Sequence, residues 1–188
     1  MFDIIYSYFA HSSVITIFVL ALLSFYFITL FSIFIYKYFS LSSLIEKEEY
    51  TLQLLISKGF SSHYDSKLCK CINDATHSKE LFNACEISII KDASNGVSWL
   101  SIISSTSPFI GLFGTVVGIL ESFSKFAGET KVGFGDIAPA ISEALVATAA
   151  GIFVAIFAYS FHQIIVRKIY EFNVIVKAES DIIIAKSL

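Results

Sequence analysis

Three long apolar runs without a charged side chain restrict this chain to few possible folds. No ionised residue occurs between Asp3 and Lys37, and two further charge-free runs cover residues 93–120 and 144–166. Each run exceeds the roughly 20 apolar residues that an α-helix needs to cross about 30 Å of hydrocarbon. Buried helices of a water-soluble core would need a larger polar remainder, because 55% of the 188 residues are hydrophobic and only 15% are charged. We therefore predict an all-α protein that crosses a membrane three times.

The predicted organisation is a single membrane domain over residues 1–188. It divides into six consecutive segments: a span at about 12–36, a cytoplasmic helical loop at 37–96, a span at about 97–124, a periplasmic loop at 125–137, a span at about 138–166 and a cytoplasmic helical tail at 167–188. Within the first loop we expect one helix that stops before Gly59 and a second over 79–93, with Leu81, Cys85 and Ile89 on one face.

The third span is predicted to continue as one long helix. No glycine or proline occurs over 152–188, and Pro139 suits the first turn of a helix. Such a helix would project well into the cytoplasm. Its projecting part carries Tyr170 and Val174, which a single helix would expose to water. We therefore expect partner helices, and hence an oligomer.

The basic residues predict the orientation of the chain. Seven of the 13 Lys and Arg residues lie in 37–91 and four in 167–186, whereas Lys125 and Lys131 are alone on the opposite side. The positive-inside rule places the first loop and the tail in the cytoplasm, and the N-terminus and the 127–136 loop outside. The start of the sequence lacks the basic region of a cleavable signal, so we expect the first span to be retained. A net charge of −3 gives no basic field for nucleic acid.

Small and hydroxyl side chains follow one face of the second and third runs. They are Ser104, Ser107, Gly111, Thr115, Gly118 and Ser122, with Gly114 beside them, and Ala140, Ala144, Thr148, Gly151, Ala155 and Ala158. Because membrane helices lack a hydrophobic drive to associate, such faces bring backbones close together. The first span has no such pattern and is expected to face lipid.

Thr115 and Thr148 lie near mid-depth of two predicted spans, and their role has two interpretations. Each hydroxyl could simply bond its own i−4 carbonyl. Alternatively, the two hydroxyls could line a polar track through an apolar wall, since a hydroxyl both donates and accepts. Glu143 lies about one turn inside the third span, where the helix N-terminus favours its charge. It is either an interfacial acid or a proton-entry residue.

Other site types are not supported by the spacing of the candidate residues. Cys69 and Cys71 with His63 and His77 do not match a zinc pattern, so no metal or cofactor is expected. The glycines of 111–118 lie inside a span and lack the lysine of a phosphate loop. No nucleophile–base–acid set is visible among the four histidines, so we do not expect an enzyme.

Two segments resemble a known family. Residues 107–119, SPFIGLFGTVVGI, closely resemble the second-span signature of the TolQ/ExbB proton-channel family, and residues 138–151, APAISEALVATAAG, resemble its third-span signature. The Ser-Pro-Phe start favours TolQ over ExbB. The resemblance implies that Thr115 and Thr148 are pore threonines and that Glu143 is the third-span acid. Ser107, Gly111, Gly114, Gly118, Ala144, Gly151 and Ala155 would then pack helices at the pore.

The resemblance also implies partners. A homopentameric ring in the bacterial inner membrane would surround transmembrane helices of a TolR/ExbD-like protein, whose Asp carries the proton, and would transmit force to a TolA/TonB-like periplasmic arm. The expected function is a Tol-Pal-type motor that uses proton motive force for cell-envelope work. Alternatives are an ExbB-type subunit for TonB-dependent transport, or a passive membrane scaffold. A MotA-type flagellar stator would need four spans and a large charged cytoplasmic domain.

The orientation can be tested by thiol labelling. We expect a Gly128→Cys side chain, in a background without native cysteines, to react with an impermeant reagent added from the periplasmic side. Native Cys69, Cys71 and Cys85 should react only after the membrane is permeabilised. The reverse pattern would overturn the predicted orientation.

Overall fold

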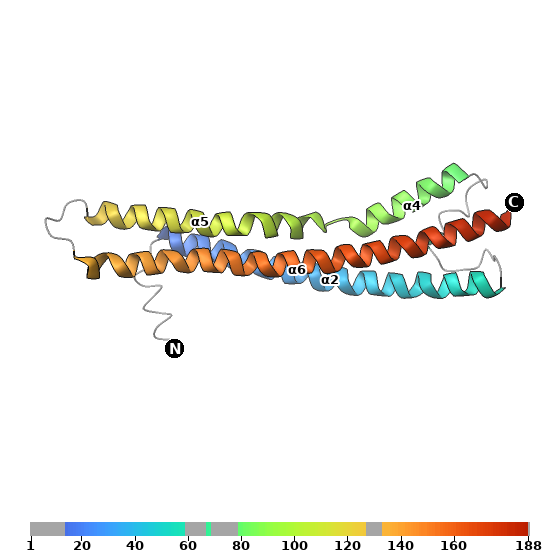
Figure 1. Cartoon of the computed structure of the whole chain (residues 1–188), viewed down its shortest axis with the longest axis horizontal. Helices are drawn as coiled ribbons and strands as arrows, with labels where there is room; N and C mark the ends of the chain where they lie inside the picture. The colour runs from blue at the N-terminus through green and yellow to red at the C-terminus, as the bar shows by residue number, and fades with distance from the viewer. Residues whose placement is uncertain (1–13, 59–66, 69–78, 127–132, 188) are drawn as a thin grey trace. The chain divides into compact units, whose positions relative to one another are not determined.

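The computed structural model describes residues 14–58, 67–68, 79–126 and 133–187, and its elements are α-helices (Figure 1). They are α2 (Val14–Lys58), α4 (Lys79–Ser94), α5 (Ser98–Phe126) and α6 (Phe134–Ser187). Three segments are long and apolar enough to cross a membrane, namely Ile15–Ser57, Ser98–Ser124 and Ile137–Ala185. The predicted all-α, three-span fold class is confirmed. The limits of the individual spans and the ring stay predictions.

Glycine and proline explain where these helices begin and end. The helix α2 stops at Lys58, directly before Gly59 in the sequence. Between α4 and α5 the chain turns at Gly96, whose φ of 80° suits a residue without a Cβ. The helix α6 begins at Phe134, earlier than the predicted start at Pro139. Pro139 is thus the sixth residue of α6, where it lacks the N–H group that would otherwise donate to the Gly135 carbonyl.

The chain forms two compact units, and α2 and α6 contribute to both. The first unit contains residues 1–32 and 99–160, so α5 packs in it with the first parts of α2 and α6. Val19, Leu23 and Leu30 of α2 are buried in this unit. The ring of Phe27 contacts those of Phe153 and Phe157, each with centroids 5.9 Å apart. One face of the first span therefore packs against protein, which the prediction of a lipid-facing role did not include.

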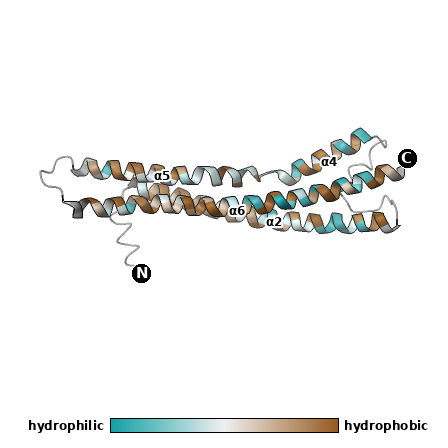
Figure 2. Ribbon diagram, viewed as in Figure 1, coloured by the Kyte–Doolittle hydropathy of each residue, from teal (hydrophilic) through white to brown (hydrophobic). Residues whose placement is uncertain are grey.

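The second unit contains residues 33–98 and 161–188. Figure 2 shows more hydrophilic residues on α4 and the C-terminal part of α2 than on the helices of the first unit. The rings of Phe34 and Phe161 stack at 3.9 Å, and Lys168 Nζ lies 4.7 Å from the centroid of the Tyr38 ring. Lys37 Nζ donates to the Ala93 carbonyl at 3.3 Å, near the end of α4. These contacts tie α2 to both of its neighbours in the unit.

The buried face of α4 differs from the predicted one by one position. Phe82, Cys85 and Ile89 are buried, but Leu81 is 40% exposed. Steps of four residues drift by about 40° around a helix, so positions 81, 85 and 89 spread over a wide arc. Phe82 and Cys85 are three residues apart and Cys85 and Ile89 four apart, which keeps them on one face.

Cys85 is disulfide-bonded in this structure. The partner cysteine lies outside the described residues. The labelling test of native cysteines needs a free thiol, so labelling of Cys85 requires prior reduction.

The packing of the second unit predicts how stability responds to truncation of one side chain. Phe172 of α6 is fully buried, and Phe172→Ala should lower stability by about 3–5 kcal/mol because it leaves a cavity. Asn173→Ala provides a control on the same helix, since Asn173 is exposed. Thermal unfolding of the purified protein in detergent checks this difference. Equal unfolding temperatures for the two variants would contradict the packing described.

Candidate functional site

Two helices of the first unit come into backbone contact where glycines of α5 and α6 face each other. A Cβ atom added to Gly151 would lie 2.5 Å from the Ser107 carbonyl oxygen and 3.0 Å from the Gly111 Cα. A Cβ atom added to Gly111 would lie 2.7 Å from the Ala147 carbonyl oxygen. Real Cβ contacts are not this short, so both positions require glycine. We call this contact between α5 and α6 the seam.

The remaining small residues extend the seam in both directions. A Cβ atom on Gly118 would meet the Ala144 methyl at 3.3 Å, and one on Gly114 would meet a Val19 methyl of α2 at 3.0 Å. Ser107 is buried and donates to its own i−4 carbonyl, that of Ile103, at 2.6 Å. Ala155 and Ala158 of α6 are also buried. The small residues therefore pack helices of the same chain against one another.

Thr115 and Thr148 meet within the seam, and their hydroxyl groups are hydrogen-bonded to each other. Thr115 Oγ1 also lies 3.0 Å from the Ala144 carbonyl oxygen on the opposite helix. Thr148 Oγ1 lies 3.3 Å from the Gly111 carbonyl oxygen, again across the seam. Since Gly111 and Ala144 are the i−4 residues of Thr115 and Thr148, each hydroxyl reaches the carbonyl that the other threonine would bond by default.

The two threonines differ in accessibility. Thr115 is only 9% exposed, whereas Thr148 is half-buried. Leu145 and Ile152, at i−3 and i+4 from Thr148, share its side of α6 and are accessible on the isolated chain. The threonine pair therefore reaches the surface of the chain at Thr148, within an apolar surround.

Comparison with known proteins identifies the family of the chain. The chain matches the MotA/TolQ/ExbB proton channel family over residues 47–177. It is 42% identical over 188 residues to the ExbB-like 1 protein of Helicobacter pylori strain J99, a match that covers 99% of this chain and 100% of that protein. This chain belongs to the MotA/TolQ/ExbB proton channel family. The family resemblance predicted from the two motifs is confirmed.

Shorter matches include both named branches of the family. The Tol-Pal system protein TolQ of Haemophilus influenzae is 46% identical over 67 residues, which is 36% of this chain and 29% of TolQ. The biopolymer transport protein ExbB of Pseudomonas putida is 43% identical over 79 residues, which is 42% of this chain and 24% of ExbB. These identities are too similar to separate the branches, and the preference for TolQ stays a prediction. Membership in a family of membrane proton channels assigns the chain to transport rather than to a class of enzymes.

Glu143 lies apart from the threonine pair along α6. It precedes Thr148 by five residues on the unbroken helix α6, which corresponds to about 140° around the helix axis. The side chain is half-buried on its own side of α6. The structure therefore brings Thr115 and Thr148 together but does not bring Glu143 to them.

Sequence reasoning missed the two backbone carbonyls that complete the polar cluster. The Gly111 and Ala144 carbonyl oxygens accept across the seam only because no side chain separates the helices there. A small residue four positions before each threonine is the sequence signal that could have indicated them. This signal is weak by itself, since alanine and glycine are common in membrane helices.

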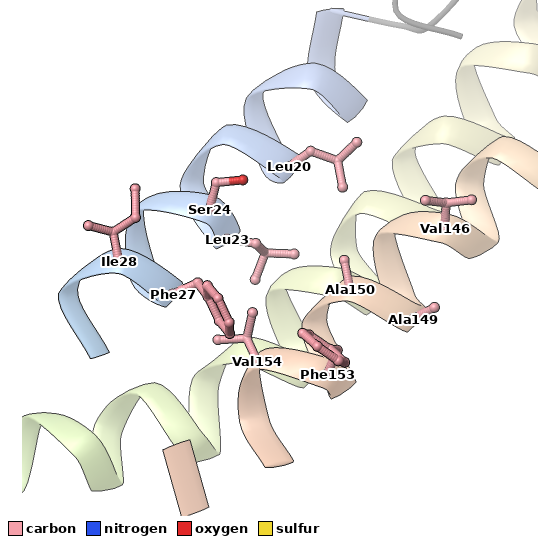
Figure 3. A pocket seen from close by; sticks show the side chains of 10 residues that line it. All are labelled: Leu20, Leu23, Ser24, Phe27, Ile28, Val146, Ala149, Ala150, Phe153 and Val154. Carbon is pink, nitrogen blue, oxygen red and sulfur yellow. The ribbon is translucent and has the colours of Figure 1, made fainter. Parts of the chain in front are cut away.

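An apolar groove of about 540 Å³ lies between α2 and α6 in the first unit (Figure 3). Leu20, Leu23, Phe27 and Ile28 line it from α2. Val146, Ala149, Ala150, Phe153 and Val154 line it from α6. Ser24 is the single hydroxyl residue of this lining. The groove lacks the charged and amide groups that would orient a small polar ligand, so the seam remains the candidate site.

The seam predicts that even one methyl group at its centre is not tolerated. Gly151→Ala should lower the unfolding temperature because α5 and α6 must move apart, whereas Gly135→Ala should not, since a Cβ atom there meets no other atom within 4 Å. Thermal unfolding in detergent measures both variants. Wild-type stability of Gly151→Ala would show that the helices do not approach as described.

Proposed function

We propose that this chain is the ring-forming subunit of a TolQ–TolR-type inner-membrane complex, in which proton motive force energises work on the cell envelope. The observation that carries this proposal is the hydroxyl pair of Thr115 and Thr148 within the apolar first unit. Hydroxyl groups reduce the cost of bringing an ionisable group into hydrocarbon, because they offer hydrogen bonds where water is absent.

The proton would be carried by an acid of a partner protein. In the charge-free runs 93–120 and 144–166 this chain has no carboxyl group of its own. A single-span TolR/ExbD-like protein with an Asp in its membrane helix would supply that group next to Thr148, the accessible threonine. Each charge that crosses the membrane potential gains about 2.3 kcal/mol per 100 mV, so a few protons suffice to move one helix past another.

The proposed assembly is a homopentamer around the partner helices. The N-terminus and the 127–136 loop would face the periplasm, where a TolA/TonB-like protein would receive the force. The tail would lie in the cytoplasm, as the distribution of Lys and Arg favours. Because the small residues pack α5 on α6 of the same chain, contacts between copies would use larger side chains, such as the accessible Leu112.

A second candidate function follows from the relative that matches along the whole chain. That protein is named as ExbB-like and a biopolymer transport protein. An ExbB-type subunit would use the same seam and energise TonB-dependent transport instead of the Tol-Pal system. Capture of the single-span partner by a tagged copy of this chain, followed by identification of its periplasmic domain, separates the two.

Removal of either seam hydroxyl should stop proton-driven function. Thr115→Val or Thr148→Val retains the shape of the side chain but leaves polar groups of the seam, and a partner acid beside it, without a hydrogen bond. Such a loss costs about 1–3 kcal/mol for each buried group. Energy-dependent envelope function in cells that depend on the variant chain provides the measurement. Thr→Ser at the same positions should retain most activity.

Thr106→Val provides the matched control. Thr106 lies on α5 as well, but its hydroxyl bonds its own i−4 carbonyl, that of Ile102, at 2.7 Å. This variant should behave as wild type. Full activity of the Thr115→Val, Thr148→Val double variant, with assembly intact, would favour the passive scaffold.

Glu143→Gln distinguishes an acid that conducts from one that only adjusts proton entry. Because Glu143 lies on another side of α6 than the threonine pair, we expect this variant to lose less activity than Thr148→Val. The same assay of energy-dependent function compares the two. An equal loss would indicate that Glu143 itself carries protons.

A further inference from the structure

The hydrogen bonds of the seam account for both hydroxyl protons of the threonine pair. Thr115 Oγ1 contacts Thr148 Oγ1, the Ala144 carbonyl at 3.0 Å and the Gly111 carbonyl at 3.3 Å. Thr148 Oγ1 contacts Thr115 Oγ1 and the Gly111 carbonyl at 3.3 Å. One proton lies between the hydroxyl oxygens, and the other is donated to a carbonyl oxygen. This holds whichever threonine donates to the other.

The lone pairs of the same hydroxyl groups are mostly unused. Each hydroxyl oxygen can accept two hydrogen bonds, and the bond between the threonines occupies one of the four positions. The pair is therefore able to accept a hydrogen bond from outside without any change in the seam. Donation to an outside group would require an existing bond across the seam to break. The hydroxyl oxygen that can accept a hydrogen bond from outside is that of Thr148, because Thr115 is buried.

No neighbouring charge alters this preference. Around the seam, residues 93–120 of α4 and α5, residues 144–166 of α6 and residues 14–36 of α2 contain no Lys, Arg, Asp or Glu. The other ionisable side chains of these stretches are Tyr26 and Tyr36 of α2 and Tyr159 and His162 of α6. The acids closest in sequence are Glu121 on α5 and Glu143 on α6. Each points to a different side of its helix from the threonine on the same helix. In these stretches no Lys or Arg side chain is present to favour a carboxylate.

We propose that the threonine pair binds a carboxylic acid in its neutral, protonated form and discriminates against the carboxylate. The inference rests on the proposed function, in which a partner acid comes beside Thr148. A protonated carboxyl group donates its O–H to a free lone pair of Thr148, whereas a carboxylate can only accept and finds no available proton. The apolar side chains beside Thr148, Leu145 and Ile152, add to the cost of the charged form.

The proposal fixes where protons enter and leave relative to the seam. An acid that passes Thr148 keeps its proton while it is hydrogen-bonded there. It gains that proton before it reaches the seam and loses it after it has moved away. The threonine pair would thus stabilise the protonated form of the acid while it passes the apolar wall.

An acid placed on this chain tests the preference without any partner. In the full-length chain, Ile152→Asp puts a carboxyl group one turn after Thr148, and side chains at i+4 lean back toward residue i. The midpoint pH at which the infrared band of the protonated carboxyl disappears is measured for this variant in lipid nanodiscs. The measurement is repeated with Thr148→Val added. We expect the midpoint to fall by about 0.4–1 pH unit, the equivalent of one net hydrogen bond to the neutral acid.

Matched variants assign the shift to the hydroxyl. Thr148→Ser added to Ile152→Asp should leave the midpoint unchanged, and so should Thr106→Val, whose hydroxyl bonds its own helix. Thr148→Ala repeats the comparison with a side chain that differs in size. A midpoint that rises on loss of the Thr148 hydroxyl, or that does not move in either variant, would overturn the inference. Such a result leaves the proposed function standing, because that depends on loss of proton-driven activity in cells.

Discussion

Backbone contact between α5 and α6 at Gly111 and Gly151 is the constraint on which the rest of the membrane unit depends. A Cβ atom at either position would overlap backbone atoms of the opposite helix. The close approach brings the Thr115 and Thr148 hydroxyls together and lets each reach a carbonyl of the other helix. It also forms the surface on which Val19 of α2 packs over Gly114. Packing and polar chemistry therefore have the same cause.

A hydroxyl pair suits an apolar wall because it satisfies itself at rest. Both protons are used within the seam, so no donor is left unpaired in hydrocarbon. Side chains with a permanent charge in this place would need a fixed counter-charge and would hold any moving acid too firmly. Threonine retains free acceptor positions at little cost. Membership in the MotA/TolQ/ExbB proton channel family supports the proposal that this arrangement serves proton movement.

Much of the fold could be predicted from residue patterns, because charge-free runs and helix breakers act locally. The three helices that could cross a membrane and the end of α2 before Gly59 follow from such patterns. The buried face of α4 was assigned to Leu81 instead of Phe82, since a four-residue period drifts around a helix. The packing of Val19 against Gly114 depends on the distance between helices, which no local pattern contains.

The same limit applied to the candidate site. Spacing placed Thr115 on one face of its run and Thr148 on one face of another, but it did not indicate that the two hydroxyls bond each other within one chain. The family resemblance also named Glu143 as the third-span acid, and on the unbroken helix α6 five residues separate its side chain from that of Thr148 by about 140°. Residue types indicated the chemistry, and the tertiary contact between α5 and α6 decided which residues share it.

Potential-driven proton flux tests the central claim most directly. The chain and its co-purified partner would be reconstituted into liposomes that contain a pH-sensitive dye, and a potassium diffusion gradient would impose the membrane potential. We expect rapid acidification of the lumen with the wild-type complex, and a rate equal to that of empty liposomes when both seam hydroxyls are removed by Thr115→Val and Thr148→Val. Equal flux through the wild-type and the double-variant complexes would contradict a proton pathway at the seam.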